Sequence, residues 1–158
     1  MLRYLLVGLI MASSFDLLAQ GSSQGVYYSF RVKPHEDLKK AITDFAVAHK
    51  IKAGAIVSCA GSLEQFNIRF ANQPDGTIQK GFFEIVSLTG TISDSSSHIH
   101  ISVSDTKGNT VGGHLIDKNL IYTTAEIVIV DLTDLEFTRE KDPTYGYPEL
   151  VVKKKRNE

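Results

Sequence analysis

The sequence has a single cysteine, Cys59, so an internal disulfide is excluded. Its neighbours Val57, Ser58 and Ala60 are small or apolar, which predicts a buried, small hydrophobic residue rather than a nucleophile. The chain also has little net charge, because 17 basic residues offset 18 acidic ones to give a formal charge of −1. It therefore lacks the long-range attraction that draws a strongly basic domain to nucleic acid.

The amino-terminal apolar run is short for a membrane-spanning helix, because Asp16 interrupts it soon after Ala12. A positive charge precedes this run, and Ala19 and Gly21 are small residues at the spacing of a cleavage site. We therefore expect residues 1–21 to be a secretory signal and the mature protein, with no membrane span, to be periplasmic or secreted. The alternative is an amphipathic extension that stays attached to an intracellular soluble protein.

The rest of the chain has the length and the 42% hydrophobic content of one domain with a sizeable core. Pro34 and Asp37 are typical of a helix start, and an apolar stripe continues to about Lys50. We expect the domain to cover residues 22–150, followed by a solvated basic tail at 151–158. The residues of the helical stripe are Leu38, Ala41, Ile42 and Phe45.

Strand patterns dominate elsewhere, and polar turns separate them. No internal repeat or second linker interrupts this order. The sequence therefore predicts a single α+β domain with a mostly antiparallel sheet and one main helix near the amino terminus. The expected strands are residues 28–32, 55–60, 63–71, 81–93, a hairpin from 97 to 115, 120–131 and 135–139.

Three of the five histidines fall within that hairpin. His98 and His100 are two residues apart, so a strand places both on one face. If residues 105–109 form the turn, His100 faces His114 across the ladder. Three imidazoles with an open fourth position are typical of a catalytic zinc site. The alternative is that they are polar residues on a solvated strand face.

Two carboxylates, Glu84 and Glu126, lie in strands whose alternating faces are both apolar, and this pattern predicts that they are buried. A buried carboxylate needs a partner or takes up a proton. The partner is then an arginine, a metal-bound water or a set of backbone donors. The purely structural alternatives are an internal ion pair with Arg69 or Arg139, or exposure at a sheet edge.

The succession of motifs across residues 26–150 resembles the plant and prokaryote conserved (PPC) domain. The resemblance implies a compact α+β domain that assembles as a homotrimer. Plant members join this domain to an AT-hook that enters the minor groove of DNA, and this sequence contains no Arg-Gly-Arg-Pro core of such a hook. The motifs are Ala60-Gly61-Ser62-Leu63, the run from Phe83 to Ile92, His98-Ile99-His100-Ile101-Ser102, Gly112-Gly113-His114-Leu115, Thr124-Ala125-Glu126-Ile127 and Phe137-Thr138-Arg139.

Histidine-bearing members of the family are similar in fold to acetolactate decarboxylase, a zinc lyase whose metal is held by a His-x-His pair and a later histidine. The resemblance implies zinc, or another divalent metal, at His98, His100 and His114. It makes Glu84 and Glu126 candidate acid/base residues.

The function expected from these features is a homotrimer that binds zinc and a small oxygen-bearing ligand, with lyase-type turnover as its enzymatic form. Arg69 is a candidate for pairing with charge on that ligand. The alternative is a DNA-associated or protein-interaction scaffold without catalysis. A near-neutral chain without an AT-hook predicts only weak, salt-dependent binding to nucleic acid.

Overall fold

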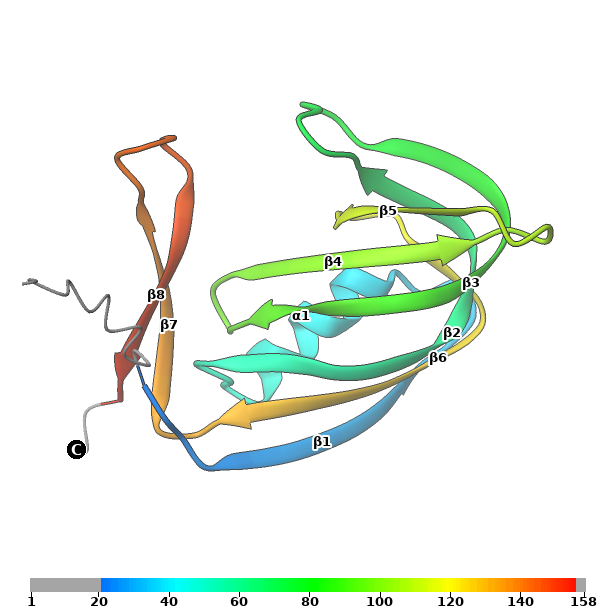
Figure 1. Ribbon diagram of the computed structural model, residues 1–158. Helices are drawn as coiled ribbons and strands as arrows, with labels where there is room; N and C mark the ends of the chain where they lie inside the picture. Colours follow the sequence, from blue (N-terminus) through cyan, green and yellow to red (C-terminus); the bar gives the residue numbers. More distant parts are fainter. Residues whose placement is uncertain (1–20, 156–158) are drawn as a thin grey trace, which may run out of the picture.

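A computed structural model describes residues 21–155, and the expected signal at 1–21 lies almost wholly outside them. One six-stranded, strongly curved antiparallel sheet forms most of the structure, in the order β1-β6-β2-β3-β4-β5 (Figure 1). A short additional pairing joins β5 to β2, so one end of the sheet curls towards closure. Its strands are β1 (Gly25–Val32), β2 (Gly54–Arg69), β3 (Thr77–Ile92), β4 (Ser97–Ser104), β5 (Thr110–Leu115) and β6 (Leu120–Leu132).

The helix α1 (Leu38–Ala48) packs its apolar stripe on one face of this sheet (Figure 1). Asp37 caps it, because its Oδ1 accepts a hydrogen bond of 2.9 Å from the Lys40 backbone N–H. The predicted α+β class with one helix near the amino terminus is confirmed. The core between helix and sheet consists mainly of isoleucine, leucine and phenylalanine, including Leu38, Ile42, Phe66, Ile101, Ile127 and Ile129.

The remaining two strands, β7 (Leu135–Lys141) and β8 (Pro148–Lys154), form a separate twisted ribbon at the end of the sheet (Figure 1). A small cluster of Ala53, Leu135 and Phe137 holds the base of this hairpin. Strand β8 continues to Lys154, so the first residues of the expected basic tail pair with β7. The sequence pattern did not predict this strand, because the residues at its two ends are polar.

Strand β2 is continuous where the sequence suggested two strands separated at Gly61. Its pairing with β6 shifts register between Gly61 and Leu63, which marks an irregularity in the ladder. A Cβ at Gly61 would clash with the backbone of Thr124, so the glycine permits a close approach of the two strands. Cys59 lies on this strand, and burial raises the pKa of its thiol to about 11, consistent with an unreactive residue.

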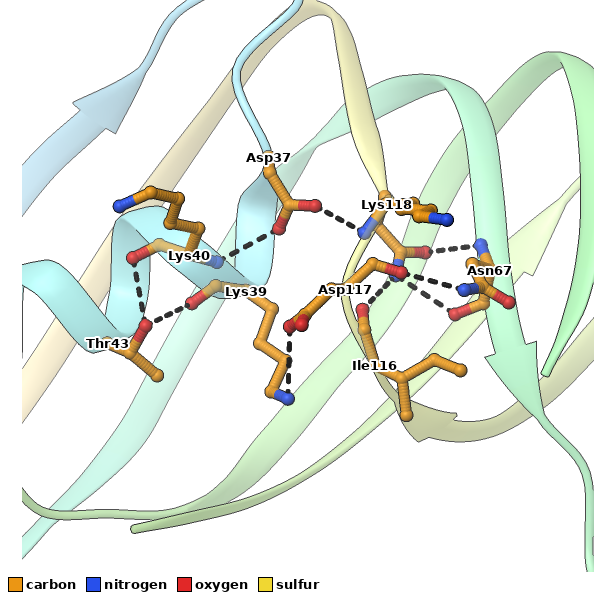
Figure 2. A network of polar contacts seen from close by, with 9 residues as sticks. Asp37, Lys39, Lys40, Thr43, Asn67, Ile116, Asp117 and Lys118 are labelled. Atoms are coloured by element: carbon orange, nitrogen blue, oxygen red, sulfur yellow. Dashed lines mark hydrogen bonds and ion pairs between the residues drawn. The ribbon is translucent and has the colours of Figure 1, made fainter. Parts of the chain in front are cut away.

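A polar network fixes the loop between β5 and β6 against α1 (Figure 2). Asn119 is fully buried, and its side chain exchanges two hydrogen bonds of 3.0 Å with the backbone of Asn67. Asp37 accepts a further hydrogen bond from the Lys118 backbone, and Lys39 forms an ion pair of 3.1 Å with Asp117. This network therefore fixes the segment that directly follows His114.

No helix among residues 21–155 is long and apolar enough to cross a membrane.

Candidate metal centre and adjoining pocket

The β4–β5 hairpin positions the histidines through its register. His100 pairs with His114, and Ser104 pairs with Thr110, so the register predicted from the sequence is confirmed. Ile99 and Ile101 point into the core, while His98 and His100 lie on the opposite, exposed face. The pleat of β4 thus presents two imidazoles side by side, and the ladder adds the third.

The turn that sets this register is held by Asp105. Its Oδ1 accepts hydrogen bonds of 2.8 Å from the Lys107 N–H and 2.9 Å from the Asn109 N–H, and its Oδ2 accepts one of 2.9 Å from the Asn109 side chain. These bonds, led by that from the Asn109 side chain, lower the pKa of Asp105. Gly108 completes the turn with a φ of 84°, a conformation that favours glycine.

The three imidazoles converge on one point. Each offers a ring nitrogen, and these atoms lie within 4.8 Å of one another. The ring centroids are separated by 4.6 Å for His100 and His114, 5.0 Å for His98 and His100, and 5.3 Å for His98 and His114. Tetrahedral zinc with nitrogen ligands needs separations of about 3.4 Å, which small side-chain rotations provide. The triad therefore fits a metal ion.

The surroundings favour neutral imidazoles, which is the form that binds a metal. Burial lowers the pKa of His98, and the nearby His100 and Arg139 lower it further. Burial likewise lowers the pKa of His114, with Arg69 as the next cause. Positive charge on both sides of the triad thus disfavours a proton there.

A pocket of about 570 Å³ adjoins the triad and includes His98 and His114 in its wall. It combines basic and apolar groups, and Glu149 is the one acidic side chain among the described residues that line it. The hairpin β7–β8 supplies one side of the pocket. The hairpin residues in the wall are Arg139, Tyr147, Pro148 and Glu149.

The structure places Arg69 in the wall of this pocket. Arg69 is the β2 residue that pairs with His114. Its Nη1 donates a hydrogen bond of 3.3 Å to the Gln73 carbonyl. Arg139 also lines the pocket, although the sequence suggested it as an ion-pair partner for a glutamate and as part of a family motif, and not as a pocket residue. Neither arginine forms an ion pair with a carboxylate within residues 21–155.

The expectation that Glu84 and Glu126 are buried is wrong for the single chain, because both are exposed. Their neighbours Phe83 and Ile127 point into the core, so the two glutamates lie on the opposite face of the sheet. Apolar side chains such as Phe82 also lie exposed on these strands, which is why both faces looked buried in the sequence. Glu84 does not line the pocket at the triad, and Glu126 lines a different pocket with Cys59.

Gly113 permits the closure of the sheet beside the triad. A Cβ on this residue would lie 2.6 Å from the carbonyl oxygen of Arg69, which is too close for any other residue without a shift of the backbone. The glycine therefore allows β5 to approach β2 and brings His114 next to Arg69.

The sequence reasoning missed the contribution of Tyr147 and Glu149 to the pocket. Both follow the turn between β7 and β8, where the sequence shows a Pro-Thr-Tyr-Gly-Tyr-Pro segment and no strand pattern. The two prolines and the glycine between Lys141 and Glu149 are typical of a turn, and this pattern would have indicated a hairpin of two paired strands.

Comparison with known proteins identifies relatives of this chain. It is 40% identical over 127 residues to the bifunctional protein GlmU of Synechococcus sp. (strain JA-3-3Ab), a match that covers 80% of this chain and 20% of that protein. The chain thus spans about a fifth of the length of this curated relative.

Solved structures share the fold. A hypothetical protein from Salmonella cholerae-suis is 32% identical, with a TM-score of 0.85 over 86% of this chain and 99% of its own. A putative DNA-binding protein from Bacteroides thetaiotaomicron is 23% identical, with a TM-score of 0.69 over 83% and 98% of the two chains. A metal-containing protein from Archaeoglobus fulgidus is 24% identical, with a TM-score of 0.68 over 83% and 95%.

The sequence pattern of one family matches residues 19–133, which includes the helix, the curved sheet and all three histidines of the triad. The match ends just before β7, so the hairpin that lines one side of the pocket lies beyond it. The chain belongs to the Plants and Prokaryotes Conserved (PCC) domain family, the one that its motifs resemble.

Proposed function

We propose that this protein binds zinc through His98, His100 and His114 and holds a small oxygen-bearing ligand in the adjoining pocket. The observation that carries this proposal is the convergence of three ring nitrogens within 4.8 Å on two paired strands. A site of three neutral imidazoles suits zinc, which when bound would supply an open position that polarises a ligand oxygen. The metal-containing relative from Archaeoglobus fulgidus has the same fold, which supports a metal here.

The chain's own residues would orient such a ligand. Arg69 lies beside His114 and presents a guanidinium without a carboxylate partner among the described residues, so it suits the pairing with ligand charge expected from the sequence. A proton-transfer role for Glu84 or Glu126 needs a second protomer, because neither lines this pocket within one chain. Lyase-type turnover is therefore a proposal that depends on assembly.

We also propose that the protein forms the homotrimer that the family resemblance implies. Large apolar side chains are exposed on β2, β3 and β6, and the rings of Phe82 and Tyr122 lie 4.7 Å apart there. Val57 and Val86 are each more than half exposed on the same strands. Burial of these groups between protomers is a favourable driving force for association. Light scattering at micromolar concentration measures the assembly, and a concentration-independent monomer contradicts it.

Calorimetric titration with zinc tests the proposed metal site. Replacement of any one of His98, His100 and His114 by Ala should weaken zinc binding at least about tenfold, and the triple variant should lose it. His35→Ala and His49→Ala are matched controls, because both histidines lie beside α1 and away from the triad. Wild-type affinity in the triple variant would place the site elsewhere.

A DNA-associated scaffold is the second candidate, because a relative with this fold is described as a putative DNA-binding protein. With a formal net charge of −1, the chain should bind DNA weakly and with strong salt dependence. Submicromolar DNA binding at physiological salt, with no zinc binding, would favour the scaffold.

Export is a prediction from the amino-terminal pattern. The mass of the mature protein from its own host tests it, and a protein that still begins at Met1 would contradict cleavage.

A further inference from the structure

The side chain of Arg139 is fixed in place by two neighbours. Its Nη2 donates a hydrogen bond of 3.2 Å to Thr91 Oγ1, and its Nη1 lies 3.5 Å from the carbonyl oxygen of Pro148. Thr91 is the β3 residue that pairs with His98 across the sheet. The guanidinium is therefore tied to the strand next to the triad, and a guanidinium that is fixed in advance loses less entropy on binding a ligand.

The guanidinium keeps donors for a ligand. A guanidinium has five N–H groups, and the two contacts use at most one on each Nη. Arg139 has no carboxylate within ion-pair distance in residues 21–155, although Glu149 lines the same pocket. An unpaired, partly enclosed guanidinium is a favourable site for a carboxylate or a phosphate group, which it can bind through two parallel hydrogen bonds.

The charge balance of the pocket points the same way. Lys39 is already paired with Asp117, whereas Arg69 and Arg139 line the pocket on the His114 side and the His98 side without acidic partners. Glu149 offsets only one of these two charges. A neutral ligand would leave this excess charge uncompensated, whereas an anion compensates it.

We propose that Arg139 anchors the carboxylate or phosphate group of a small organic anion in this pocket, so that the β7–β8 hairpin selects anionic ligands. This inference rests on the proposed function, because the metal triad supplies the other end of the same site. Arg139 and its backbone partner Pro148 both belong to the β7–β8 hairpin, so this selectivity would come from the hairpin.

The pocket has room for a small ligand. A cavity of about 570 Å³ with His98, His114, Arg69 and Arg139 in its wall accommodates a short organic acid or its phosphate ester. Tyr147 stands at the hairpin side of the pocket and is 64% exposed, so the pocket is reached from solvent on that side.

Calorimetry on the zinc-loaded full chain tests the anchor with three probes: lactate, methyl phosphate and the uncharged lactamide. Wild-type protein should bind at least one of the two anions about tenfold more tightly than lactamide. Arg139→Gln should weaken binding of that anion at least about tenfold and leave zinc affinity within about twofold. Arg139→Lys, which keeps the charge but loses the bidentate geometry, should have an intermediate affinity.

Lys154→Gln is the matched control, because it removes one positive charge from the same hairpin at an exposed position outside the pocket. It should leave anion binding unchanged. Preference for lactate or for methyl phosphate identifies which of the two groups the guanidinium takes. Equal affinity of wild type and Arg139→Gln for both anions, with zinc binding intact, overturns the inference.

A wild-type protein that binds no zinc overturns the proposed function instead. The anion titrations then apply to the metal-free protein, where the dependence on Arg139 still decides the inference. The thermal unfolding midpoint of Arg139→Gln separates lost binding from lost folding, since the variant also gives up its hydrogen bond to Thr91.

Discussion

The curved sheet with its helix differs from the β7–β8 hairpin in how it is packed and in which residues it contributes to the site. The sheet and helix share one large core, whereas the hairpin rests on three buried residues and a few partly buried neighbours. The rigid part carries the histidines, and the lightly packed part carries Arg139, Tyr147 and Glu149. The geometry of a metal site demands the rigid support, while ligand selection tolerates a more variable one.

Removal of a large buried side chain should reveal the largest difference in stability between the two regions. Phe66 is 2% exposed and packs edge-on against Phe83 at 4.8 Å, so Phe66→Ala should lower the free energy of unfolding by about 3–5 kcal/mol. Phe137→Ala, in the small cluster of the hairpin, should lower the free energy of unfolding by about 1–2 kcal/mol less than Phe66→Ala does. It should leave zinc affinity unchanged. Chemical denaturation measures both, and equal losses would show that the hairpin shares the main core.

Acidification should steeply weaken zinc binding at the proposed site on the sheet. His98 and His114 have lowered pKa values, so both are neutral at pH 7.5 and zinc affinity is near its maximum there. As the pH falls through these lowered pKa values, protons compete with zinc, and affinity should drop by about tenfold per pH unit for each imidazole that has titrated. Calorimetry across this range tests the prediction. A flat profile would mean that imidazoles do not hold the metal.

A substitution that opposes the close approach of β5 to β2 at Gly113 should have a moderate effect on stability. Gly113→Ala places a Cβ against the Arg69 carbonyl and should lower the free energy of unfolding by about 1–3 kcal/mol. It should also weaken zinc binding, because β5 and His114 must move. Gly108→Asn is the control, since Asn tolerates a positive φ and a Cβ there meets nothing within 4 Å. Unchanged zinc affinity in Gly113→Ala would show that β5 adapts without moving the histidine.

The smallest effect should come from the ion pair on the hairpin itself. Lys153 and Glu140 are 3.0 Å apart, with exposed side chains on both strands. Glu140→Gln should change the free energy of unfolding by less than about 0.5 kcal/mol, because exposed ion pairs contribute little. Thermal unfolding at low and high salt measures this. A larger loss would indicate that charge, and not the small apolar cluster, holds the hairpin together.

The sequence was informative where local rules decide the structure. Alternation around His98 and His100 and the turn at residues 105–109 were sufficient to predict the register that joins His100 to His114. The sequence was misleading for Glu84 and Glu126, because exposed apolar residues such as Phe82 mimic a buried face. The place of Arg139 depends on how the hairpin meets the sheet, and this is a tertiary contact that no local pattern encodes.

The hairpin begins at Leu135, just after the matched family segment ends at residue 133. It is joined to the sheet through a single short connection after β6, and its own strands pair only with each other. Two contacts hold it against the sheet: the Phe137 N–H donates a hydrogen bond of 3.0 Å to the Lys52 carbonyl, and Arg139 contacts Thr91. The position of one wall of the pocket therefore depends on these few contacts, so a change at any of them would alter the pocket directly.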